Sequence, residues 1–165
     1  MTSSWSQSDT LTNSFERTYK KVNPTINYKY DQEKQIHDYS NNWDFDKDGT
    51  PDHVYFIGTG GAHLYYFLRV TLSSDNIVRN FTFIQSDFPV LPPDNELRKT
   101  DFKPNNNQTY FAVFDDKDNN TDIFIRLDEQ TFEVDKKTLK KKGIKTNLVL
   151  ITFKNGRTIF RDFIK

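Results

Sequence analysis

Residues 53–72 read HVYFIGTGGAHLYYFLRVTL, and this stretch decides the fold. It contains two runs of β-branched and aromatic residues, the types that pack well on a pleated sheet. A glycine-rich segment at 58–61 separates the two runs, which is the pattern of two antiparallel strands joined by a loop. A polar turn at 73–76 and a third apolar run at 77–84 follow directly. The sequence therefore predicts a meander of three antiparallel strands.

The same pattern of apolar runs and turns continues on both sides of this meander. Residues 25–30 alternate apolar and polar side chains, which predicts a half-buried strand. Asn155 and Gly156 separate two apolar runs near the end of the chain, and this dipeptide is a strong signal for a tight hairpin. Further strands are expected at 110–114, 122–127, 148–153 and 158–164.

Three segments interrupt these strands. The polar stretch 31–42 has room for a helical turn, and nothing in it decides the matter. Three prolines between residues 89 and 93, with the polar tract 98–108, predict an irregular crossover. The lysine-rich residues 133–142 are the one expected helix. The fold class is therefore mainly β, as an antiparallel meander or sandwich or a propeller-like sheet, with one short helix and a calcium loop.

Composition limits the number of domains and the kinds of partner. The 165 residues suffice for one domain, so we expect a single β domain over 15–165 after a disordered polar leader at 1–14. Lys and Arg together number 23, as do Asp and Glu. The chain thus lacks the positive field on which non-specific nucleic-acid binding depends. No apolar run approaches the roughly 20 residues of a transmembrane segment.

The calcium loop occupies residues 44–52, which read DFDKDGTPD. Calcium takes six to eight oxygen ligands, and a tight loop supplies them from alternating positions around a glycine that permits the sharp turn. Gly49 stands at the sixth position, where that turn falls. The expected ligands of Ca²⁺ are the carboxylates of Asp44, Asp46, Asp48 and Asp52 and the backbone carbonyl of Thr50.

A second acidic turn lies at 114–122, where residues 116–126 align with residues 46–56. Two copies of an acidic turn followed by a strand indicate either a duplicated unit or chance convergence. Phe114 takes the place of the first ligand and Asn119 that of the glycine. Asx turns, in which Asn and Asp side chains bond their own backbone, account for this turn at least as well as a metal does.

The calcium loop is not an EF-hand, because Tyr55 stands where that motif has its bidentate Glu and a strand follows where it has a helix. The loop and its strand resemble the calcium-loop β proteins of the FG-GAP and VCBS type. With the glycine-rich hairpin, residues 43–72 also resemble the periplasmic lysozyme-inhibitor-like immunity proteins of bacterial secretion systems. That second resemblance implies a hairpin loop that enters the cleft of a partner enzyme.

The resemblance places the partner surface on this hairpin. The implied contact residues are Thr59, Gly60, Gly61, His63 and Tyr65. The same glycines are also explained by positive φ alone. No nucleophile pattern or free pair of placed carboxylates supports an enzyme. We therefore expect a non-enzymatic, calcium-stabilised inhibitor or immunity protein against an effector or cell-wall hydrolase. The alternative is an adhesion module of an exported lipoprotein that binds glycan or a surface protein.

An exported location fits these features. The chain has no cysteine, and its polar beginning is also what remains when a signal peptide or a lipoprotein anchor is removed. A calcium site of weak affinity fills more readily outside the cytoplasm. We expect the periplasm or the cell surface of a bacterium, and a cytoplasmic location stays open. The oligomeric state is not predicted, and the lysines at 136–145 are either a solvated helix face or a contact for an acidic partner.

Overall fold

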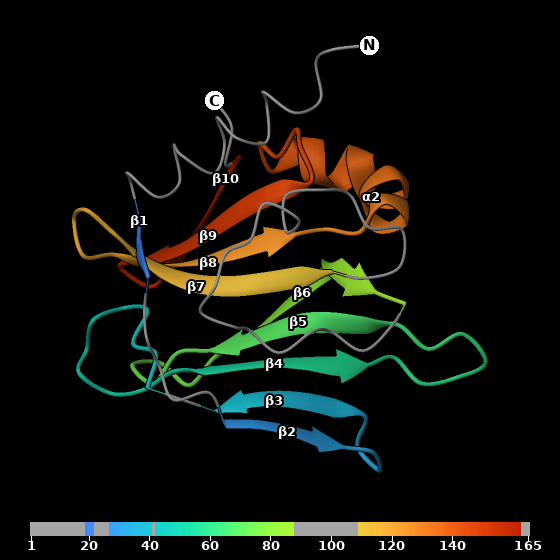
Figure 1. The fold of residues 1–165 in the computed structure, drawn as a ribbon, viewed down its shortest axis with the longest axis horizontal. Coiled ribbons are helices and arrows are strands. Elements are labelled where there is room, and N and C mark those ends of the chain that lie inside the picture. Colours follow the sequence, from blue (N-terminus) through green and yellow to red (C-terminus); the bar gives the residue numbers. More distant parts are fainter. Residues whose placement is uncertain (1–18, 22–26, 41, 88–108, 163–165) are drawn as a thin grey trace.

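The computed structural model describes residues 19–21, 27–40, 42–87 and 109–162, which form two antiparallel five-stranded sheets and a helix (Figure 1). The first sheet has the order β2-β3-β4-β5-β6, with β2 at Asn27–Asp31, β3 at Ile36–Ser40, β4 at His53–Gly58, β5 at Tyr66–Thr71 and β6 at Val78–Ser86. The second has the order β1-β7-β8-β9-β10, with β1 at Tyr19–Lys21, β7 at Tyr110–Asp116, β8 at Thr121–Arg126, β9 at Leu148–Lys154 and β10 at Arg157–Asp162. The helix, α2, spans Glu129–Lys141.

Aromatic rings join the two sheets into a sandwich with one shared core. Tyr39 on β3 stands edge-on to Phe111 on β7, with ring centroids 4.7 Å apart. Phe153 on β9 packs against Phe45, which precedes β4, at 5.6 Å, and against Phe81 on β6 at 6.5 Å. Such ring pairs add stability beyond the apolar area that they bury. Aromatic rings from the strands, with Phe45 from the loop before β4, therefore hold the sheets together.

The two sheets differ in how their outer faces are covered. Every residue of β8 is buried, whereas β4 and β5 alternate buried and half-exposed residues. Val54 and Phe56 face the core from β4, while Tyr55 and Ile57 on the opposite face are half-exposed. The first sheet thus presents one face to the outside.

Helix α2 begins at a side-chain cap. Asp128 accepts a hydrogen bond from the Thr131 backbone N–H at 2.7 Å, which satisfies a donor that the first helical turn leaves free. Leu139 is the helix's buried apolar anchor, and Gln85 on β6 donates to Asp135 at 3.0 Å. The expected helix at 133–142 is confirmed, but it starts four residues earlier because Asp128 caps it.

The predicted β class is confirmed, with corrections to the elements. The meander and the Asn155–Gly156 hairpin form as expected. The segment 31–42, where a helical turn had room, contains a turn and then strand β3. The strand expected from residue 63 begins only at Tyr66, so the preceding loop is longer than predicted. The expected leader at 1–14 and the expected crossover at 89–108 both lie outside the described residues.

Both sheets follow the same plan. The loop with the first acidic cluster joins β3 to β4, the second and third strands of one sheet. The other acidic turn joins β7 to β8, the second and third strands of the other sheet. The aligned residues Asp52 and Asp122 are both buried, with exposed fractions of 4% and 0%. The two acidic segments thus occupy equivalent places in the two sheets, and duplication and convergence both stay open.

Candidate metal centre

Three acidic side chains converge in the loop before β4. Each of Asp44, Asp46 and Asp48 offers a carboxylate oxygen, and these oxygens all lie within 4.8 Å of one another. Oxygen ligands bind calcium at about 2.3–2.6 Å, so two ligands on opposite sides of the ion lie about 5 Å apart. The spacing of this acidic triad, as we call these three residues, therefore fits the ion that the sequence predicts.

The loop backbone folds around the triad. Gly49 has a φ of +89°, a conformation that glycine adopts without steric cost. The turn directs the backbone N–H groups of Asp48 and Gly49 to the Asp44 carboxylate, at 3.1 and 2.9 Å. Asp48 in turn accepts from the Thr50 N–H at 2.7 Å. The Asp48 N–H also lies 3.3 Å from the Asp46 carboxylate, so the loop contacts all three carboxylates with its own amides.

Two serines from the turn after β5 support the triad. Ser73 Oγ donates to Asp48 at 2.7 Å, and Ser74 Oγ donates to Asp46. The sheet register explains their position, because His53 at the start of β4 pairs with Thr71 at the end of β5. Neither serine is among the ligands predicted from the sequence. The predicted hairpin could have indicated them, because a hairpin brings the outer ends of its two strands together.

Asp52 holds the loop in place through hydrogen bonds to backbone groups. Its carboxylate accepts from the Phe45 N–H at 2.6 Å and from the Ser73 N–H at 2.7 Å, while its own N–H donates to the Trp43 carbonyl at 2.6 Å. Burial raises the pKa of Asp52, and the charges of Asp46 and Asp44 raise it further. Asp52 lies outside the converging triad. Its two hydrogen bonds connect the loop to the β5–β6 turn.

The remaining predicted ligand, the carbonyl of Thr50, faces the serine turn. It lies 3.4 Å from Ser73 Oγ, the same hydroxyl that contacts Asp48. The Thr50 oxygen and the Asp48 carboxylate therefore lie on the same side of the loop. The structure brings Asp44, Asp46 and Asp48 together and places the Thr50 carbonyl near the serine that contacts Asp48, while Asp52 lies outside the triad.

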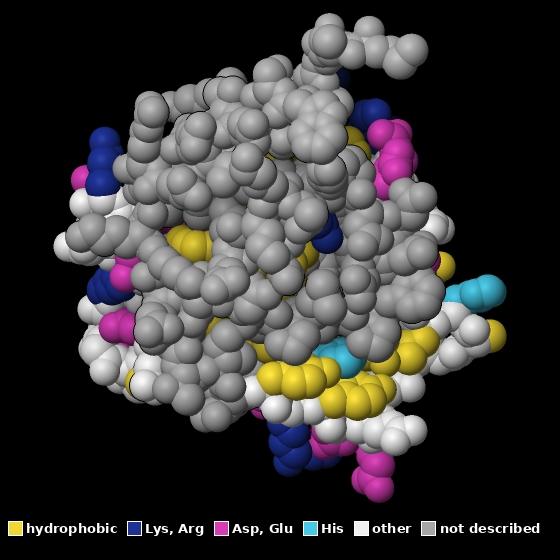
Figure 2. Space-filling model, viewed as in Figure 1, with side chains coloured by type: hydrophobic (Ala, Val, Ile, Leu, Met, Phe, Trp, Pro, Cys, Tyr) yellow, Lys and Arg dark blue, Asp and Glu magenta, His cyan; other side chains and the backbone are white. Residues whose placement is uncertain are grey.

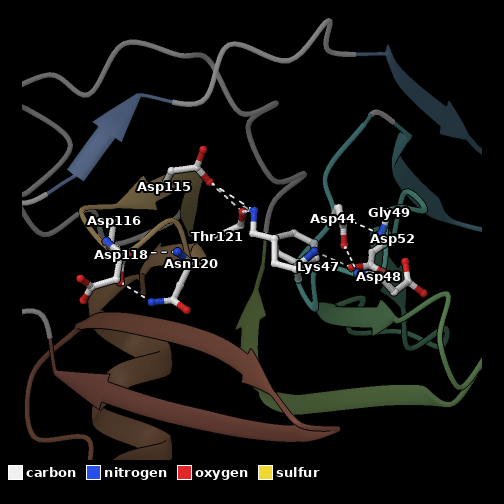
Figure 3. A network of polar contacts seen from close by, with 11 residues as sticks. Asp44, Lys47, Asp48, Gly49, Asp52, Asp115, Asp116, Asp118, Asn120 and Thr121 are labelled. Atoms are coloured by element: carbon white, nitrogen blue, oxygen red, sulfur yellow. Dashed lines mark hydrogen bonds and ion pairs between the residues drawn. The ribbon is translucent and has the colours of Figure 1, made fainter.

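The charge of the triad has no cationic partner among the described side chains. Lys47 belongs to the same loop, but its Nζ reaches away to the second acidic turn, as Figure 3 shows. There it contacts Thr121 Oγ1 at 2.5 Å and lies 3.8 Å from Asp115. The hydrogen bond from Ser73, with that from Thr50, lowers the pKa of Asp48. The Asp48 carboxylate is therefore ionised at neutral pH, and no ion pair within the described ranges neutralises it.

The second acidic turn is closed by hydrogen bonds. Asp116 accepts from the backbone N–H groups of Asp118 and Asn120 at 2.8 and 2.9 Å and from the Asn120 side-chain amide at 2.8 Å (Figure 3). Burial raises the pKa of Asp116, but these hydrogen bonds outweigh it and the pKa lies below its ordinary value. The acidic triad at 44–48 is the one convergent metal-ligand group within the described part of the chain. Asx-turn chemistry accounts for the second turn.

The predicted partner loop lies between β4 and β5. The Thr59 N–H donates to the Tyr65 carbonyl at 2.8 Å, and the Tyr65 N–H donates to Thr59 Oγ1 at 3.2 Å. Gly60 and Gly61 both have positive φ. Thr59, Gly61 and His63 are exposed at the tip, whereas Tyr65 is half-buried. The loop is closed at its neck and presents small residues and one histidine.

Comparisons with protein-family models, curated proteins and solved structures find no match. The function therefore has to be argued from the geometry of this chain. No helix in the described ranges is both long and apolar enough to cross a membrane. The described lysines at 136, 137, 140, 141, 142 and 145 are all exposed.

Proposed function

We propose that this protein is a non-enzymatic binding protein whose loop at 44–52 is stapled by a calcium ion. One observation carries the proposal: three carboxylates converge within 4.8 Å, and no cationic side chain of the described ranges pairs with them. Asp44, Asp46 and Asp48 would hold the ion, together with the Thr50 carbonyl. Calcium supplies the positive charge that offsets the repulsion between these groups.

The metal has a structural role in this proposal. The loop joins β3 to β4, and Asp52, Ser73 and Ser74 tie it to the β5–β6 turn. An ion that binds the folded loop and not the unfolded chain stabilises the fold by mass action. Calcium thereby rigidifies one end of the meander that carries the partner loop.

The partner in this proposal is a secreted or cell-wall-active enzyme, and the protein acts as its inhibitor or immunity protein in the bacterial envelope. The closed neck between Thr59 and Tyr65 supports this role, since a preorganised loop loses little entropy when it enters a cleft. Thr59 and His63 are exposed and available for contact.

The alternative function, a glycan-binding adhesion module, is favoured by the open face of the first sheet. The Arg69 guanidinium lies 5.3 Å from the centre of the Phe67 ring and 6.0 Å from that of Tyr55. Half-exposed aromatic rings beside a cation offer stacking surfaces and hydrogen-bond donors to a sugar.

A pair of variants separates the two functions. Replacing Thr59 and His63 with Arg and Glu should abolish binding to a cognate hydrolase without changing the calcium-dependent melting temperature. Tyr55→Ser changes the open face of the first sheet instead. For the inhibitor function it is the matched control, and for the glycan function it is the variant that should weaken binding. Undiminished neutralisation of the enzyme by the Thr59/His63 double variant would show that the hairpin loop is scaffold.

A further inference from the structure

The outer edge of β2 is open. β2 ends its sheet, and no strand of the described ranges pairs with it on the side away from β3. Figure 1 shows β2 at the margin of the molecule. An edge strand presents a row of unpaired N–H and C=O groups, which another strand can extend. Proteins usually protect such edges with charges, bulges or covering segments.

The side chains of β2 add an aromatic surface to this edge. Tyr28 and Tyr30 are 39% and 41% exposed and share one face of the strand, since alternate residues point the same way. The Tyr28 hydroxyl lies 2.7 Å from His37 Nδ1, and the Tyr30 hydroxyl lies 3.2 Å from that of Tyr66. Figure 2 shows hydrophobic side chains gathered around a histidine on this side of the molecule. The rings are held in place and suit a contact surface.

The opposite face of β2 carries charges in a self-complementary order. Lys29 and Asp31 are two residues apart and therefore lie on the same face. An antiparallel second copy of the strand, centred on Tyr30, places Lys29 opposite Asp31 of the second copy and Asp31 opposite its Lys29. A register centred on Lys29 would instead oppose two lysines, which is unfavourable. The charges thus select one register.

We propose that two copies of this chain pair through β2 across a two-fold axis at Tyr30, which joins their first sheets into one continuous sheet. Tyr30 packs on Tyr30 of the second copy, and the Lys29–Asp31 pair occurs twice because the contact is symmetric. A five-residue strand pair buries less surface than a permanent dimer needs. The expected dimer is therefore weak and concentration-dependent. β2 contributes no residue to the calcium loop, so this proposal and the proposed function succeed or fail separately.

A single cysteine tests the register directly, because the chain has no cysteine of its own. In the proposed dimer, residue 30 faces its own copy with Cα atoms about 4.5–5.5 Å apart, inside the range of about 4.4–6.8 Å that a disulfide spans. Residue 28 of one copy lies four positions along the strand from residue 28 of the other copy. This offset is about 13 Å, which is too far for a disulfide. The two tyrosines have nearly equal exposure, so Tyr28→Cys is the matched control for Tyr30→Cys.

Under mild oxidation, Tyr30→Cys should form a disulfide-linked dimer at least about tenfold faster than Tyr28→Cys, as measured on non-reducing gels. Equal rates for the two variants, whether fast or slow, would overturn the proposed pairing.

Charge reversal tests the same register without a covalent trap. In sedimentation equilibrium, Asp31→Lys should raise the dissociation constant of the dimer by about tenfold, since two cross-strand pairs become repulsive. Lys29→Asp should do the same, and the double variant should restore the affinity of the wild type. Lys117→Asp, an equal charge change on the exposed second acidic turn, is the control and should change nothing. Melting curves show whether either reversal also disturbs the fold, because Lys29 pairs with Asp38 on β3 and the Asp31 carboxylate accepts from the Lys34 N–H at 3.0 Å.

A wild-type chain that stays monomeric up to about 1 mM, the weak end of measurable affinities, would contradict the proposal. So would a dimer that the charge reversals leave unchanged.

Discussion

Replacing Asp46 with Asn should have opposite effects on stability with and without calcium. Asn keeps an oxygen for the Asp48 N–H, which lies 3.3 Å from the Asp46 carboxylate, and its amide suits the Ser74 hydroxyl. The substitution therefore removes a charge and preserves the shape of the loop. In chelator it relieves repulsion between Asp46 and the other two carboxylates.

The size of this relief follows from the spacing of the triad. Two unit charges 4.8 Å apart repel by about 0.9 kcal/mol in water, so two such pairs amount to about 1.7 kcal/mol. Physiological salt and the partial exposure of Asp46 reduce this to roughly 1 kcal/mol. For a chain of this size, that is a rise of about 2–4 °C in the melting temperature.

In calcium, the wild type should be more stable than Asp46→Asn. At the weak end of the predicted affinity range, with a dissociation constant of about 0.1–1 mM, about 10 mM calcium stabilises the wild type by about 1.4–2.7 kcal/mol. Asp46→Asn loses a charged ligand and most of this gain. Thermal melts of both proteins in chelator and in calcium make the comparison, and Asp118→Asn, a substitution in the second acidic turn, is the control. Equal destabilisation of Asp46→Asn in both buffers would refute the reasoning.

Three further predictions concern buried and supporting groups. Asp52→Ala leaves the N–H groups of Phe45 and Ser73 without their acceptor, so it should lower the free energy of unfolding by about 2–3 kcal/mol in calcium and in chelator alike, as measured by urea denaturation. Burial lowers the pKa of His37 below its ordinary value of 6.5. Its neutral form therefore contributes stability above pH 6.5, and this stability is lost as the pH falls through the pKa of the folded state. His37→Phe should flatten this part of the stability–pH curve. Ser73→Ala removes the main cause of the lowered pKa of Asp48, so that pKa, followed by NMR, should move up toward its ordinary value of 3.8, and an unmoved titration would contradict the hydrogen bond.

Most of the strands were predictable because their apolar runs are long and bounded by turns. β3 was missed because its inward residues are His37 and Tyr39, which carry polar atoms and do not form an apolar run with their neighbours. Their burial depends on rings from other strands, such as Phe111 against Tyr39, and such contacts cannot be derived from a five-residue window. The start of α2 was missed for a similar reason, since Asp128 is identified as a cap by its hydrogen bond to Thr131.

The candidate site was predictable where it is local. The alternation of Asp44, Asp46 and Asp48 around Gly49 fixes their convergence within one turn of chain. Ser73 and Ser74 enter from a turn more than twenty residues away, and only the pairing of His53 with Thr71 places them there. Asp52 fits the ninth position of a calcium loop. The sequence did not indicate that its carboxylate accepts hydrogen bonds from the Phe45 and Ser73 N–H groups, because these depend on the fold of the loop and on the neighbouring turn.

Calorimetric titration of the full chain with calcium tests the central claim most directly. We predict binding at one site per chain, with a dissociation constant between about 1 µM and 1 mM, that Asp48→Ala abolishes and Asp118→Ala leaves intact. Absence of binding by the wild type, or binding that survives in Asp48→Ala, would show that the loop at 44–52 is an acidic turn and not a metal centre.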